Sequence, residues 1–299
     1  LQTGAVPSTT SSSRTMNLNG SLRNPFSHQA SLQVAHQFGN DTTVSATYLL
    51  VKGQKLVFRS QNLSAVQTGT LASGKPLMAG RRFAELGEFN AIDNIGYSIY
   101  HGGTFEAAKR LNKGFGLTAS YTWSKTISNG EGPGSLADAP ESDLQLERAL
   151  SRQHLAHRFT LDFASVVTPK MPVLGGFEFN SYVSLESGRP YTIYVGSDTN
   201  QDGNSNNDRL GQLGRNTLLG PAYASFDVRV TRRLKFNDRL SSEWTCDFFN
   251  LFNRVNVRDL NTVYGSADLS QPPNPNFGYL QPKDVFNPRQ IQFGVKLKF

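Results

Sequence analysis

The 299-residue sequence predicts an all-β chain that forms part of an antiparallel transmembrane β-barrel. Apolar and polar residues alternate through most of the chain, which is the period of a strand with two different faces. No run of about 18 apolar residues occurs, which excludes transmembrane helices. A single cysteine excludes a disulfide framework and a multi-cysteine metal site. A β-rich chain therefore remains, and the lengths of its connections favour a membrane barrel.

The alternation recurs in about nine segments, each long enough to cross a bilayer at a tilt. In the last segment the odd-numbered residues from 291 to 299 are all apolar, and the residues between them are polar or glycine. One segment is weaker than the others, because Gly102 and Gly103 interrupt it. The predicted strands are Ala30–Phe38, Val44–Leu50, Tyr97–Leu111, Phe115–Trp123, Arg158–Val167, Phe177–Leu185, Phe226–Thr231, Glu243–Phe248 and Gln290–Phe299.

Short and long connections alternate strictly along the chain. The short ones are Gly39–Asp41, Asn112–Gly114, Thr168–Gly176 and Asn237–Asp238. The long ones are Lys52–Asn94, Lys125–His154, Ser187–Pro221 and Asn253–Pro288. An outer-membrane barrel has this asymmetry, with short periplasmic turns and long extracellular loops, whereas loops this long argue against a compact soluble domain. We therefore expect a bacterial outer-membrane location with a periplasmic C-terminus and extracellular long loops.

The direction of the strands predicts that more strands belong to the barrel. If the last strand ends in the periplasm, the first one runs inward, so residues 1–29 form an extracellular lead-in and residues 30–299 the barrel part. Bacterial single-chain barrels have an even number of strands, and about nine cannot make a whole barrel. We expect a C-terminal fragment that lacks the earlier strands, with residues 30–38 and 290–299 as unpaired edges.

Several stretches carry a resemblance to a known family. The most specific is Phe249–Asn256, which reads FNLFNRVN. The others are Asn24–Phe26, Gln29–Val34, Ser45–Tyr48 with Lys52 and Gly53, Ala224–Arg229 and the terminal Phe299. Together they resemble TonB-dependent receptors, and more narrowly the Oar-like subgroup, whose members carry an N-terminal carboxypeptidase-regulatory-like domain.

The resemblance implies a large barrel closed by its own N-terminal plug. Such a receptor imports a scarce bulky solute with energy relayed by TonB, and neither the plug nor a TonB-contacting segment lies within this sequence. Siderophore, oligosaccharide, peptide and cobalamin all stay open as solutes, as does a role in surface assembly. Two alternatives remain: a small stand-alone outer-membrane barrel with an adhesive, structural or enzymatic role, and a soluble carbohydrate-binding β-sandwich.

Polar residues on one face of the predicted strands are expected to line the lumen. A water-facing wall needs polar residues in any case, so wall rather than solute contact is the simpler interpretation of most of them. Solute selection is expected to belong to the long loops. The lumen-facing candidates are Arg158, Asp162, Glu178, Asn180, Asp227, Arg229, Glu243 and Asp247. The alternating C-terminal residues are predicted to be the signal for the barrel-assembly machinery: Phe293, Val295, Leu297 and Phe299.

One loop motif predicts a calcium site. The stretch Asp198–Asn206 matches D-x-[DN]-x-[DN]-G, in which oxygens at alternate positions converge on Ca²⁺ and glycine permits a sharp turn. The twelfth position is Arg209 rather than a carboxylate, so a solvated Asn/Asp/Gly turn cluster is the alternative. No other cofactor is expected. The candidate ligands are Asp198, Asn200, Asp202, Asn206 and Asp208.

The remaining reactive residues predict no catalytic site, and no enzyme is expected. His154 and His157 favour a surface or interfacial role, and no G-x-S-x-G nucleophile motif occurs. Cys246 lies on the lipid-facing side, where an inert role is expected. Arg232 lies on that side near the turn at Asn237, where its long side chain can reach the interface. The net charge of +7 is dispersed, so nucleic acid is not expected as a partner. The partners expected instead are outer-membrane lipid and the phosphates of lipopolysaccharide.

Overall fold

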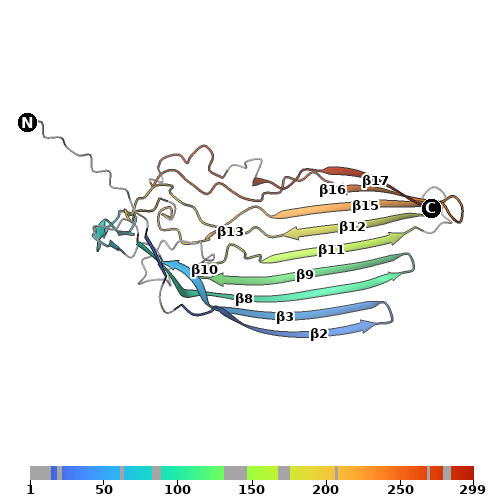
Figure 1. Cartoon of the computed structure of the whole chain (residues 1–299), viewed down its shortest axis with the longest axis horizontal. Helices are drawn as coiled ribbons and strands as arrows, with labels where there is room; N and C mark the ends of the chain where they lie inside the picture. Colours follow the sequence, from blue (N-terminus) through green and yellow to red (C-terminus); the bar gives the residue numbers. More distant parts are fainter. Residues whose placement is uncertain are drawn as a thin grey trace, which may run out of the picture.

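The computed structural model describes residues 15–18, 22–60, 64–82, 89–130, 147–167, 176–205, 208–267, 270–278 and 284–299. Its main feature is a single antiparallel sheet in which consecutive long strands are hydrogen-bonded neighbours (Figure 1). In sheet order these strands are β17 (Gln290–Lys298), β16 (Ser241–Phe249), β15 (Tyr223–Lys235), β12 (Phe177–Glu186), β11 (His157–Val166), β9 (Phe115–Ser128), β8 (Phe89–Asn112), β3 (Thr42–Ser60) and β2 (Phe26–Phe38).

The predicted strands are confirmed, in the predicted order and all in one sheet. A single sheet rather than two packed sheets runs through the described part of the chain, so the architecture is not a sandwich. Two strands extend into what the sequence predicts as the first long loop: β3 continues to Ser60 and β8 begins at Phe89. The first long strand, β2, begins at Phe26, four positions before the boundary expected at residue 30.

Several short strands lie at the loop end of the sheet. β1 (Thr15–Leu18) pairs in parallel with β8, and β10 (Ala149–Leu150) pairs with β9. The others form three small two-stranded sheets: β4 (Ala65–Val66) with β7 (Gly80–Arg81), β5 (Gly69–Thr70) with β6 (Pro76–Leu77), and β13 (Pro190–Tyr191) with β14 (Leu218–Leu219).

The long loops gather at one end of the sheet, and the short turns lie at the other end with the C-terminus (Figure 1). The predicted turn at Thr168–Gly176 lies outside the described residues except for Gly176. The turn after β2 uses Gly39 at φ +60°, a left-handed conformation that glycine adopts without steric cost. Among the described residues no helix is long and apolar enough to cross a membrane.

One face of the sheet is apolar and exposed, because alternate residues of each strand point to the same side. The exposed fractions are 69% for Leu32, 65% for Trp123 and 78% for Phe293. The buried apolar core of the described residues is small and lies among the loops instead, where Val195 and Leu210 pack with Ile193. An apolar face this broad is typical of a sheet whose solvent on that side is lipid.

The sheet is open in the described part of the chain. β2 pairs with β3 on one side and β17 pairs with β16 on one side, and no other described strand bonds to their outer edges. Each edge therefore presents a row of backbone groups that hydrocarbon cannot satisfy.

Candidate functional site

The register brings all eight predicted polar residues to one face of the sheet. Tyr182 on β12 lies opposite Asp162 on β11 and Asp227 on β15. Two positions along, Arg229 lies between Asn180 and Asp247 in the same way. Residues directly opposite each other in a ladder share a face, and so do alternate residues of one strand. The same two rules place Arg158, Glu178 and Glu243 on this face.

A cavity of about 490 Å³ lies against this face and runs obliquely from the turn end of β8 and β9 to the loop end of β16. Five of the eight predicted residues line it: Asp162, Asn180, Asp227, Arg229 and Asp247. The other three, Arg158, Glu178 and Glu243, do not line it. The cavity is thus walled by charges of both signs from β11, β15 and β16, with the neutral Asn180 of β12 between them.

Ion pairs neutralise much of this face. Arg229 contacts Asp247 at 2.5 Å, and Arg233 bridges Glu178 at 2.5 Å and Glu243 at 2.7 Å. Sequence reasoning missed Arg233, although it lies four positions after Arg229 and on the same face of β15. A wall of paired charges presents hydrogen-bonding groups to water without a large field of one sign.

A larger cavity, of about 1150 Å³, lies where the loops meet the sheet. Its sheet side is formed by Tyr182, Ser184, Glu186 and Tyr223, which carry the parity of the predicted polar face. Its loop side adds two further tyrosines and a set of arginines: Tyr191, Tyr194, Arg152, Arg189, Arg209, Arg215 and Arg258. The site that selects a solute is best placed here, because the loops bring charged and aromatic side chains together over the polar face.

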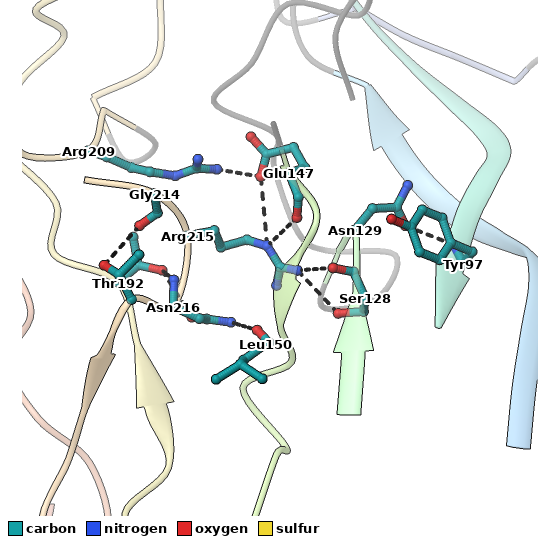
Figure 2. A network of polar contacts seen from close by, with 11 residues as sticks. Tyr97, Ser128, Asn129, Glu147, Leu150, Thr192, Arg209, Gly214, Arg215 and Asn216 are labelled. Atoms are coloured by element: carbon teal, nitrogen blue, oxygen red, sulfur yellow. Dashed lines mark hydrogen bonds and ion pairs between the residues drawn. The ribbon is translucent and has the colours of Figure 1, made fainter. Parts of the chain in front are cut away.

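A buried polar network fixes the loop side of this cavity (Figure 2). Glu147 is 1% exposed, and its carboxylate accepts a hydrogen bond from Arg209. Arg215 donates from Nε to the Glu147 carbonyl at 3.0 Å and from Nη2 to the Ser128 hydroxyl at 3.2 Å. These bonds join the end of β9 to two loop segments that lie far away in sequence.

Asn216 extends the same network. It donates from Nδ2 to the Leu150 carbonyl at 2.8 Å, and its carbonyl oxygen accepts from the Thr192 hydroxyl at 3.0 Å. Asn216 has φ +53°, a conformation that asparagine tolerates better than most residues. The network therefore holds β10 and the segment that follows β13 in one arrangement.

Most of the predicted calcium ligands lie together in one loop. The Asp198 carboxylate accepts amide hydrogens from Asp202 and Gly203, and Asp202 Oδ1 accepts one from Asn204 at 2.8 Å. Asp208 Oδ2 accepts from the amides of residues 199 and 200. Asn206 lies outside the described residues, and the described part of the chain holds no group of three or more metal-binding side chains. The calcium site stays a prediction, which a calcium titration of thermal unfolding would test.

The other singled-out residues lie on or near the apolar face. Cys246 is opposite Val230 and Phe293. Arg232 is opposite Phe177, and its guanidinium carbon lies 4.6 Å from the centre of that ring, a cation–π contact that sequence reasoning missed. His154 corrects an expectation: the sequence favours a surface or interfacial role, but the side chain is buried, and its Nδ1 accepts the Thr126 amide hydrogen at 3.2 Å.

Comparison with known families decides what this sheet belongs to. The sequence matches the family described as outer membrane beta barrel domain over residues 2–210 and 204–292. The chain belongs to this family. The exposed apolar face is accordingly the face toward lipid, and the protein is an outer-membrane protein. No curated protein matches the sequence.

Solved structures share the fold at low sequence identity. The outer membrane transporter YddB from Escherichia coli is 10% identical with a TM-score of 0.57, over 93% of this chain and 33% of that one. A mutant of the ferric enterobactin receptor PfeA from Pseudomonas aeruginosa is 13% identical with a TM-score of 0.52, over 94% of this chain and 32% of that one. The ferric-catecholate import receptor Fiu from E. coli K12 is 11% identical with a TM-score of 0.51, over 93% and 28%. The chain spans about a third of the length of these proteins.

Proposed function

We propose that the chain is the C-terminal part of the barrel of a TonB-dependent receptor of the Oar-like subgroup, which imports a bulky solute across the outer membrane with energy relayed by TonB. Membership of the outer-membrane barrel family supports the barrel, and the FNLFNRVN stretch supports the subgroup. The fold shared with an outer membrane transporter, an import receptor and a ferric enterobactin receptor supports the role.

Tyr182 carries the functional argument, because it lines both cavities. The loop cavity and the polar face of the sheet therefore form one continuous polar surface, from the loop end toward the turn end. A solute that binds among the loops has a hydrophilic path along the sheet, which is what an importer needs and what an adhesive or purely structural barrel does not. The volume of about 1150 Å³ suits a solute larger than most drug-sized ligands.

The orientation and the missing barrel strands belong to the same proposal. The loop end faces outside and the C-terminus faces the periplasm, where Phe293, Val295, Leu297 and Phe299 present the assembly signal. Strands of the longer receptor pair with the open edges of β2 and β17, since lipid provides no hydrogen-bond partner. The receptor's own plug fills the lumen and contacts the paired charges of the polar face.

Solute uptake by cells that make the full-length protein tests the proposal. The probes are radiolabelled ferric enterobactin, cyanocobalamin, maltoheptaose and tetra-alanine, each measured with and without a protonophore. We expect uptake of one probe class, loss of that uptake when the protonophore removes the energy source, and surface binding that persists. Uptake that ignores the protonophore, or no uptake of any probe, contradicts the proposal.

A pair of variants then tests the path. Tyr182→Ala is expected to reduce uptake about tenfold, since it removes a side chain shared by both cavities. The matched control is Tyr48→Ala, which removes a tyrosine from the apolar face and leaves uptake unchanged. Equal effects of the two variants would argue against a path along the polar face.

A further inference from the structure

A group of basic residues, two lysines and two histidines, lies on the apolar face of the sheet, at its loop end. His101 on β8 is directly opposite Lys125 on β9, and Lys52 on β3 lies two positions from the residue that faces His101 on its other side. His157 on β11 is opposite Trp123, two positions from Lys125. All four basic side chains are exposed. We call Lys52, His101, Lys125 and His157 the basic patch.

The basic patch is contiguous across four neighbouring strands. Opposite residues in an antiparallel pair have Cβ atoms about 5 Å apart, and diagonal neighbours about 7–8 Å apart. One anionic group of the size of a phosphate can therefore contact Lys52, His101 and Lys125 together. Figure 1 shows β3, β8, β9 and β11 side by side, with this end of each strand toward the loops.

Tyrosines hold both histidines of the basic patch in place. The Tyr48 hydroxyl is hydrogen-bonded to Nδ1 of His101 at 2.7 Å, and the Tyr121 hydroxyl to Nδ1 of His157 at 2.8 Å. The rings of Tyr121 and His157 also stack, with centroids 6.1 Å apart. Each imidazole is thereby oriented through Nδ1, which leaves Nε2 for an outside partner.

The position of the basic patch relative to the membrane follows from its aromatic neighbours. These are Trp123, the two tyrosines and the hydrocarbon-facing residues below them. Trp123 is 65% exposed and Phe105, further toward the turn end, is 60% exposed. Tryptophan and tyrosine gather where headgroups meet hydrocarbon. The lysines are on the loop side of these aromatic residues, at the level of the lipid headgroups, where their ammonium groups meet phosphates.

In the described part of the chain, the lysines of the basic patch lack the carboxylates that neutralise other lysines of this protein. At the turn end Lys109 lies 3.7 Å from Asp41, and Lys235 lies 2.7 Å from Asp238. Within the described side chains of β2, β3, β8, β9 and β11, the only acids are Glu106 and Asp162, and the register puts both on the polar face. Lys52 and Lys125 thus form no ion pair in the described part of the chain.

We propose that Lys52, His101 and Lys125 bind a phosphate on the headgroup of an outer-leaflet glycolipid, with Tyr48, Tyr121 and Trp123 against its sugar and acyl boundary. The lysines without ion pairs suit the phosphate of such a lipid. The aromatic residues beside them suit its sugar, and the apolar surface directly below suits its acyl chains. The choice of leaflet rests on the orientation proposed above. The site itself is independent of any transported solute.

Native mass spectrometry of the full-length protein in detergent tests the site. The probes are hexa-acylated diphosphoryl lipid A and the same lipid without phosphates. We expect Lys52→Gln/Lys125→Gln to weaken binding of the phosphorylated lipid about thirtyfold, since each lysine at an anionic lipid surface is worth roughly a fivefold change in affinity. Binding of the phosphate-free lipid should not change. The matched control, Lys235→Gln, removes a lysine at the turn end and should bind like the wild type.

Several further measurements can contradict the proposed lipid site. Unchanged binding by the double variant, or equal losses for both lipids, overturns the site. Displacement of the lipid by inorganic phosphate at equal concentration shows a simple ion site and also overturns it. Equal affinity for dioleoyl phosphatidylglycerol overturns the choice of a glycolipid. If the double variant does not fold, as judged by heat modifiability, the single variants Lys52→Gln and Lys125→Gln are measured, each with an expected loss of about fivefold. Solute uptake is measured separately, so failure of the transport proposal leaves a different signature.

Discussion

Arg229 on β15 holds Asp247 on β16 through two parallel hydrogen bonds, from Nε to Oδ1 at 2.5 Å and from Nη2 to Oδ2 at 2.9 Å. The two side chains differ sharply in burial: the arginine side chain is 56% exposed and the aspartate side chain 9%. Bidentate pairs of this kind are among the stronger hydrogen-bonded interactions in proteins. The unequal burial predicts that removal of each partner has a different cost.

The Arg229→Met change should cost more stability than the Asp247→Asn change. Without Arg229, the nearly buried Asp247 carboxylate loses its charged partner, which costs about 2 kcal/mol of unfolding free energy. Without the Asp247 charge, the half-exposed guanidinium is solvated by water, and the cost is about 1 kcal/mol or less. Urea unfolding of the full-length protein in lipid vesicles measures both. A larger loss for Asp247→Asn would contradict the burial argument.

The loop network leads to a second prediction, in which Arg215→Lys loosens the loop side of the large cavity. A lysine amine cannot reach both the Glu147 carbonyl and Ser128, which the planar guanidinium spans. We expect a local loss of about 2 kcal/mol, seen as roughly thirtyfold faster amide exchange around residues 147–150. Arg152→Lys is the control, because that side chain is 64% exposed and pairs with Asp259 at the surface. Equal exchange in both variants would show that the network does not hold the loops.

The strands could be predicted from sequence because lipid on one side and water on the other impose a period of two. The least regular strand, β8, shows where that signal fails. Gly102 interrupts the pattern, but a Cβ there would lie 2.2 Å from the Tyr100 hydroxyl oxygen, so the tyrosine side chain covers the glycine. The tyrosine thus fills the gap on the polar face, whereas Gly103, opposite Trp123 on the apolar face, has no side chain within 4 Å of the place of its Cβ.

The loop network and the basic patch could not be predicted in the same way. Glu147 and Arg215 are 68 positions apart, and no periodic pattern links residues in two different loops. The three lysine and histidine residues around the proposed phosphate come from three strands, and only the register between those strands brings them together. Local alternation predicts which face a residue occupies, whereas its neighbours across the sheet depend on turn geometry and bulges such as the one between Gly53 and Leu56.

A third prediction concerns His154, which lies between β10 and β11. Burial, then the nearby positive charges of Lys125 and His157, hold its pKa below the usual histidine value of 6.5. Because the folded state disfavours the protonated ring, this histidine contributes stability above pH 6.5, and that contribution is lost as the pH falls through the lowered pKa of the folded state. Protonation would also remove the acceptor for the Thr126 amide.

The Lys125→Gln change should raise the pKa of His154 toward the usual value, because it removes one of the two repelling charges. The histidine Cε1–H signal in an NMR titration of the full-length protein reports this pKa. Lys235→Gln, at the opposite end of the sheet, serves as the control and should leave the titration unchanged. An unchanged His154 titration in Lys125→Gln would show that the charge of Lys125 does not lower this pKa.

The open sheet leads to the last prediction, on the size of the native protein. The outer edges of β2 and β17 need strands to pair with, and the three solved structures that share the fold are about three times as long as this chain. An antibody raised against residues 1–299 should therefore detect, in isolated outer membranes, a species far heavier than 32.9 kDa. A folded species of 32.9 kDa would instead require β2 and β17 to close on each other or on a second copy. A small stand-alone barrel would then replace the TonB-dependent receptor as the leading account of this protein.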